Sequence, residues 1–124
     1  MKVKIDTREN FHVITIIENT LAANMTEEMD NCLMPLLQKA VKNVVVNLKD
    51  IKMLDNAAAE FLVQIQQTFY ENNASFVICE LQPQVEEELD KTHLLEMMNV
   101  TPTESEAGDI ILMEEIEREL MDGV

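Results

Sequence analysis

The chain has 124 residues, of which 47% are hydrophobic and 27% are charged, and its formal net charge at pH 7 is -15. This length suits one domain with a buried core, and the composition is that of a globular chain, not a disordered one. The acidic balance excludes a general binder of nucleic acid or anionic membranes, because both require a basic surface. No apolar run approaches the roughly 18 residues of a transmembrane helix, and the first residues lack the apolar core of a signal peptide. We therefore expect a cytoplasmic protein.

The negative charge is concentrated in the last third of the chain. Residues 1–79 have a net charge of -3, whereas residues 80–124 have a net charge of -12 with only two basic residues. One interpretation is that the last helices have acidic faces exposed to solvent. The alternative is that this acidic surface attracts a basic partner. Glu86, Glu87 and Glu88 are consecutive, so on a helix they point in different directions and predict no metal site.

The first residues predict a β-hairpin. Apolar and polar residues alternate over residues 3–8, which is typical of a strand with one solvated face. Residues 11–17 are apolar on nearly both faces, so the second strand should lie nearer the centre of the sheet.

A helix and a buried strand follow. Asn24 and Glu27 resemble a capping box at a helix start, and apolar residues then recur at helical spacing up to residue 41. Pro35 lies inside this pattern and should kink or split the helix. The apolar run at residues 44–48 predicts a strand that is buried on both faces.

The second half of the chain repeats this alternation. Residues 58–69 have the apolar spacing of a helix, and residues 76–79 predict another buried strand. Pro83 suits the first turn of a third helix, and residues 99–101 predict a short last strand. A second capping box at residues 103–106 begins the final helix. Ile110, Met113, Ile116 and Leu120 recur at helical spacing and mark this final helix.

This order predicts an α/β fold as a single domain over residues 1–124. We expect a mixed sheet of roughly four to five strands with about four helices. The strands at residues 44–48 and 76–79 are joined through a helix, so they should be parallel with a right-handed crossover.

Motifs of enzymes are missing. The only serines are Ser75, before a strand, and Ser105, at a helix start, and the histidines His12 and His93 have no motif around them. Two glycines in the whole chain argue against a phosphate-binding loop. Cys32 and Cys79 lack the spacing of a metal or redox motif and are expected to be buried apolar residues. We therefore expect no enzymatic activity, no metal site and no cofactor.

The stretch VVVNLKDIKMLDNAAAEFL at residues 44–62 combines a buried strand, a short connection and a helix start. It resembles the STAS domain, the fold of bacterial anti-sigma factor antagonists, and the order of elements over residues 3–121 agrees with that fold. The family pattern has Asp-Leu after the strand and Asp-Ser-Ser-Gly at the helix start. This chain has Asn-Leu at residues 47–48 and Asp-Asn-Ala-Ala at residues 55–58, so the motif is half preserved.

The resemblance implies a protein-interaction module. In the family, the unmodified antagonist binds an anti-sigma factor, often a serine kinase, and phosphorylation of a serine at the second helix start breaks the complex. The matching position is Ala57, and residues 27–67 contain no Ser, Thr or Tyr. We therefore expect binding of an anti-sigma factor or kinase-like regulator without this switch. Asn56 is expected to cap the helix. The expected contact set is Asp55, Asn56, Ala57, Ala58 and Glu60.

Other functions stay open. The chain could be a STAS subunit or scaffold of another assembly, such as a lipid-transport ABC system or a signalling complex. It could also sense a small anionic ligand, because free N–H groups at a helix start favour anions; Asp55 and Glu60 oppose this hypothesis. Residues 56–58 could also be simply a good helix start, with a cap followed by strong helix formers.

Overall fold

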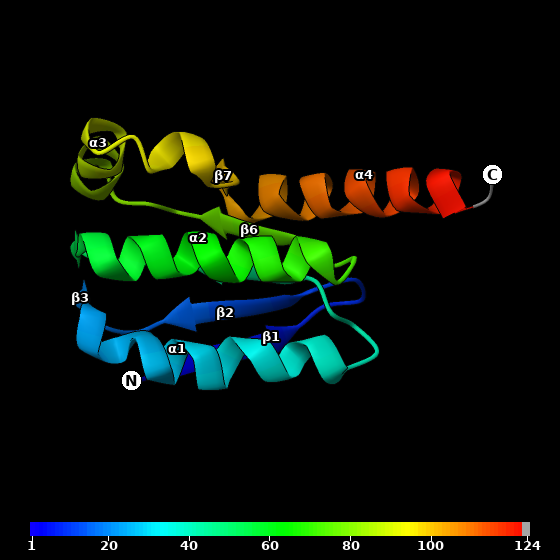
Figure 1. Ribbon diagram of the computed structural model, residues 1–124, viewed down its shortest axis with the longest axis horizontal. Coiled ribbons are helices and arrows are strands. Elements are labelled where there is room, and N and C mark those ends of the chain that lie inside the picture. The colour runs from blue at the N-terminus through cyan, green and yellow to red at the C-terminus, as the bar shows by residue number, and fades with distance from the viewer. Residues whose placement is uncertain (123–124) are drawn as a thin grey trace.

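The structure is a computed structural model that describes residues 1–122. Its centre is a five-stranded sheet in the order β1-β2-β4-β6-β7 (Figure 1). β1 is antiparallel to β2, and the other neighbouring pairs are parallel, so the predicted hairpin and the predicted mixed sheet are confirmed. The strands are β1 Val3–Thr7, β2 His12–Ile16, β4 Val44–Asn47, β6 Phe76–Cys79 and β7 Val100–Thr101.

Helices cover both faces of this sheet. The helices are α1 Thr26–Leu33, α2 Asn56–Glu71, α3 Pro83–Lys91 and α4 Glu104–Asp122, with 3₁₀ turns at Ala23–Met25, Met34–Gln38 and Leu95–Met97. On β4, Val44 and Val46 pack in the core with α1 and α2, whereas Val45 packs with α4 on the other face. Alternate side chains of a strand point to opposite faces, which is why the valine run is buried throughout.

The helix before β4 is divided in two, as Pro35 predicts. α1 ends at Leu33, and Pro35 lies in the first turn of the 3₁₀ segment that follows, where its missing N–H costs no hydrogen bond. The predicted capping box at the start of this helix is wrong, because α1 has no side-chain cap. The Thr26 hydroxyl instead donates to the carbonyl of Ala23 across the preceding turn, at 3.0 Å.

α4 begins at its predicted capping box. The amide of Glu106 donates to Thr103 Oγ1 at 3.2 Å, and that hydroxyl donates to Glu106 Oε1 at 3.1 Å. The helix is buried on the side of Ala107 and Ile111. Gly108 lies on the same helix, and a side chain there would come within 3.2 Å of the Phe11 ring. Small residues therefore allow α4 to approach the sheet closely.

The final helix is confirmed as α4, but the apolar residues that mark it in the sequence do not form its buried side. Met113, Ile116 and Leu120 are 60%, 49% and 68% exposed, and Ile110 is half-buried. The side that contains Ala107 and Ile111 packs against the sheet instead, in one cluster with Val45 and Val77. No helix among residues 1–122 is both long and apolar enough to cross a membrane.

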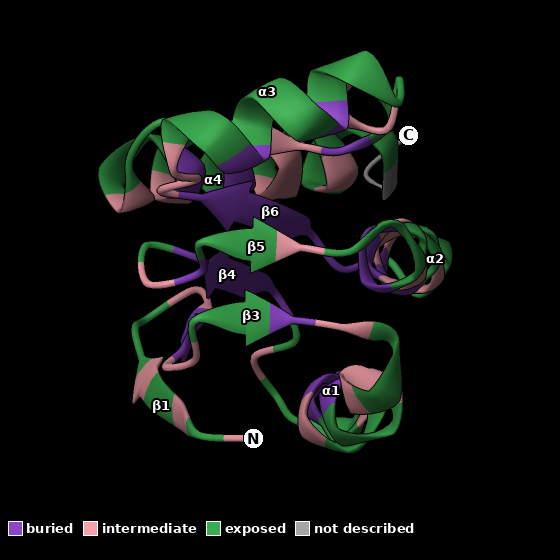
Figure 2. Cartoon of the chain, turned by 90° about the vertical axis from the view of Figure 1, so that its left-hand side faces the viewer, coloured by how far each residue is buried: buried purple, intermediate pink, exposed green. Residues whose placement is uncertain are grey.

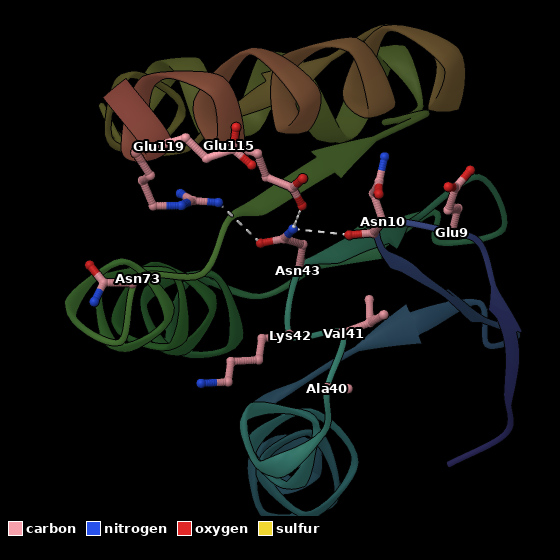
Figure 3. A pocket seen from close by; sticks show the side chains of 10 residues that line it. Glu9, Asn10, Ala40, Val41, Lys42, Asn43, Asn73, Glu115 and Glu119 are labelled. Carbon is pink, nitrogen blue, oxygen red and sulfur yellow. Dashed lines mark hydrogen bonds between the residues drawn. The ribbon is translucent and has the colours of Figure 1, made fainter. Parts of the chain in front are cut away.

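Polar contacts join the C-terminal half of α4 to the rest of the molecule. Arg118 donates to Ser75 Oγ at 3.0 Å and to Asn43 Oδ1 at 3.3 Å. The amide nitrogen of Asn43 donates to the Asn10 carbonyl and to Glu115, so Asn43 connects three segments of the chain (Figure 3). Asn43 and Ser75 are buried, and these bonds satisfy polar atoms that water cannot reach.

Candidate functional site at the start of α2

The start of α2 lies beside a small second sheet. This sheet consists of β3 Thr20–Leu21 and β5 Met53–Leu54, which pair in parallel. Figure 2 shows both strands next to the loops at one end of the main sheet. Both strands fall in segments, residues 18–23 and 49–54, for which the sequence predicts no strand. The backbone amide of Asp55 donates to the Leu21 carbonyl at 3.0 Å, so the small sheet positions the first turn of α2.

Asp55 is the N-cap of α2. Its backbone is extended, with φ -75° and ψ 153°. Its Oδ1 accepts hydrogen bonds from the amides of Ala57 at 2.7 Å and Ala58 at 3.3 Å, and its Oδ2 accepts one from Ala23 at 3.4 Å. The prediction that Asn56 caps the helix is therefore wrong, because Asn56 is already its first helical residue. A cap must stand before the helix so that its side chain can reach the free amides of the second and third helical residues.

The predicted contact residues divide into an exposed group and a buried one. Asp55, Asn56, Ala57 and Glu60 are exposed. Ala58 is 0% exposed, since its methyl group points into the core beneath the helix. Its side chain cannot touch a partner, and the expectation that Ala58 belongs to the contact surface is corrected accordingly. We call Asp55, Asn56, Ala57 and Glu60 the α2 surface.

Met53 also lies at this site, although it is not among the predicted contact residues. This side chain is 67% exposed on β5 and lies two residues before the cap. A depression of about 450 Å³ is lined by Met53 together with Lys52, Leu54 and residues of α3. No local sequence signal identifies it, because the half-buried state of Leu54, from which the opposite direction of Met53 follows, is known only from the structure.

The structure also brings a hydroxyl group near the α2 surface. Thr20 is exposed on β3, where it pairs with Met53 in the small sheet. It lies far from Ala57 in the sequence, so a search of the local motif could not detect it. No group of three or more His, Cys, Asp and Glu side chains within residues 1–122 is placed to hold a metal ion.

The arrangement leaves little room for an anion at the start of α2. The first free amides of a helix attract anions, but here the Asp55 carboxylate already accepts two of them. A phosphate or carboxylate ligand would have to displace that side chain and lie against its negative charge. The exposed residues around it suit contact with another protein better than enclosure of a small anion.

Comparisons with known proteins agree with this fold. A family model described as the STAS domain matches residues 2–107. A putative anti-sigma factor antagonist from Thermotoga maritima superimposes with a TM-score of 0.72 and 18% identity, over 88% of this chain and 93% of that one. A serine-to-glutamate variant of RsbS from Moorella thermoacetica gives a TM-score of 0.74 and 20% identity, over 95% and 99%.

A chain from a structure of the stressosome, described as a signal integration and transduction hub, gives a TM-score of 0.63 and 19% identity, over 87% of this chain and 95% of that one. At these identities the likeness concerns the fold. No curated protein matches the sequence.

Proposed function

Because the chain belongs to the STAS domain family, we propose that it is a non-enzymatic interaction module of the anti-sigma factor antagonist type. It acts in the cytoplasm as a single domain and binds a regulatory protein, an anti-sigma factor or a kinase, through the α2 surface. The observation that carries this proposal is the exposed first turn of α2, whose free amides are satisfied by Asp55. A surface that is accessible but closed to anions is available for protein contact.

In this proposal the complex is not controlled by phosphorylation at the start of α2. Ala57 occupies the position of the acceptor serine and has no hydroxyl group. A phosphate at this position would add a charge of about -1.5 to -2 next to the Asp55 carboxylate, which is how such a switch would break a complex. The alanine keeps the surface permanently free of a phosphate at this position.

A second candidate is a scaffold role within a larger signalling assembly. The similarity to a chain of the stressosome favours it over a subunit of a lipid-transport ABC system. The two candidates differ in what the chain binds. A scaffold forms a large complex with several copies of related domains, whereas an antagonist binds one regulator.

Affinity capture from native lysate tests the proposal. The tagged parent chain and its Ala57→Glu and Gln67→Glu variants would be compared by quantitative mass spectrometry. Gln67 is also exposed on α2 but lies about three turns from Ala57, so it controls for the added charge. We expect parent and Gln67→Glu to recover the same regulator, and Ala57→Glu to recover about tenfold less. Equal recovery by Ala57→Glu would refute the assignment of the α2 surface.

Treatment of the captured complex with ATP and the captured kinase tests the missing switch. We expect the parent complex to survive. The Thr20→Val variant provides the control, because it removes the nearby exposed hydroxyl. If ATP dissociates the parent complex and spares the Thr20→Val complex, the proposed independence from phosphorylation is wrong.

A further inference from the structure

A row of large apolar side chains lies on the outer side of α4. Leu112, Met113, Ile116 and Leu120 are 47%, 60%, 49% and 68% exposed. Their spacing of three to four residues places them on one side of the helix. We call these four residues the α4 stripe. The opposite side of the helix is buried at Ala107 and Ile111, so α4 is apolar on two sides and only one of them has a partner.

The orientation of α4 is fixed, so the stripe cannot turn inwards. The Tyr70 hydroxyl donates to Glu114 at 2.7 Å, and Arg118 donates to the buried hydroxyl of Ser75 at 3.0 Å. Rotation of the helix would break these bonds and leave buried polar groups unpaired, which is costly. The stripe is therefore a stable surface feature.

The charges beside the stripe have a single sign. Glu106, Asp109, Glu117 and Glu119 are exposed on α4. The one basic residue of this helix is Arg118, and its guanidinium is used in the contacts with Asn43 and Ser75. An exposed apolar row with acidic margins complements an apolar row with basic margins.

We propose that the α4 stripe is a docking site for an amphipathic helix of another protein, with Lys and Arg on both sides of its apolar face. Pairing of two amphipathic helices is a common mode of recognition. A second copy of this chain is a poor occupant, because its acidic margins would face these acidic margins. An anionic membrane is repelled for the same reason.

The stripe is separate from the α2 surface. Figure 1 shows the start of α2 at one end of the molecule and the C-terminal half of α4 at the other. The stripe also lies beyond residues 2–107, the segment that the family model matches. One partner could therefore occupy the α2 surface while another occupies the stripe, and the two proposals can fail independently.

A synthetic peptide provides the probe. The probe is an amphipathic helix of about 18 residues made of Leu and Lys, labelled for fluorescence anisotropy, and the comparison peptide has Glu in place of Lys. We expect the Leu/Lys peptide to bind the parent chain, and the triple variant Met113→Ser, Ile116→Ser, Leu120→Ser to bind it about tenfold more weakly. The control is Met53→Ser, which removes an equally exposed methionine elsewhere. Because the triple variant keeps every charge, a loss of binding reports the stripe itself.

A second set of variants tests the acidic margins. We expect Asp109→Asn, Glu117→Gln, Glu119→Gln to weaken binding more than the matched change Glu86→Gln, Glu87→Gln, Glu88→Gln on α3. No binding of the Leu/Lys peptide, equal binding by the serine variant, or equal binding of the Leu/Glu peptide would overturn the proposal. Sedimentation gives a further check. If the parent chain is a dimer and the serine variant is a monomer, the occupant of the stripe is a second copy of this chain, and the proposal is overturned.

Discussion

The carboxylate of Asp55 and the backbone amide of Ala57 form a 2.7 Å hydrogen bond at the start of α2. This bond joins the N-cap residue to the second residue of the helix. The negative charge of Asp55 therefore stabilises the start of the helix, because it lies next to the positive end of the helix dipole. The bond also leaves the Asn56 side chain, which makes no cap, available to a partner.

Loss of this cap should destabilise the fold. We expect Asp55→Ala to lower the free energy of unfolding by about 1 kcal/mol, because two amides of α2 and the amide of Ala23 lose their acceptor. Asp55→Asn should retain most of the stability, since its side-chain oxygen still accepts. Asn56→Ala is the matched control and should change stability by less than about 0.5 kcal/mol. Urea unfolding measures the stability of all three variants. A larger loss of stability in Asn56→Ala than in Asp55→Ala would show that Asn56 is the cap.

The buried side-chain amide of Asn43 should contribute more to the stability of the fold than an exposed polar side chain does. It accepts from the amide of Ser75 at 2.8 Å and donates to the carbonyl of Asn10 at 2.9 Å. Removing it leaves these groups unpaired, so we expect Asn43→Ala to cost about 1–3 kcal/mol. Asn31→Ala, on the exposed side of α1, should be neutral in the same denaturation experiment. Equal stability of the two variants would show that water replaces the lost bonds.

Because of Tyr70, the stability of the fold should fall as the pH becomes alkaline. Burial, followed by the hydrogen bond to Glu114, raises the pKa of its phenol above the usual 10.0. A raised pKa in the folded state means that the stabilisation is complete below pH 10 and is lost as the pH rises, because the unfolded chain releases its proton first. Tyr70 is the only tyrosine, so ultraviolet absorbance of tyrosinate reports it directly. Titration at the ordinary pKa in the native protein would contradict this prediction.

The two cysteines should differ in reactivity. Burial, with smaller contributions from Glu80 and Glu104, raises the pKa of the Cys79 thiol to about 12. Burial also raises the pKa of the half-buried Cys32 thiol. Thiolates are the reactive form, so both should be slow and Cys79 the slower. Single variants Cys32→Ala and Cys79→Ala, labelled with a disulfide reagent before and after unfolding, separate them. Rapid labelling of Cys79 in the native Cys32→Ala protein would show that its strand opens.

Local patterns in the sequence determined the order of elements and the family. The valine run of β4 and the apolar run of β6 are typical of strands buried on both faces, and Pro35 predicts the division of the helix before β4. These signals lie within a few residues of one another, so no knowledge of distant contacts is required. The α/β fold, the parallel central strands and the STAS resemblance follow from them.

Tertiary contacts decided the details of the surfaces. Asp55 is the cap because Leu21 and Ala23, more than thirty residues away, hold it in place. Ala58 is buried because the core lies beneath it. On α4, periodicity identified the helix, but the side that packs against the sheet is the one with Ala107 and Ile111. A pattern specifies which residues share a face, and only the shape of the neighbouring elements selects the face that is buried.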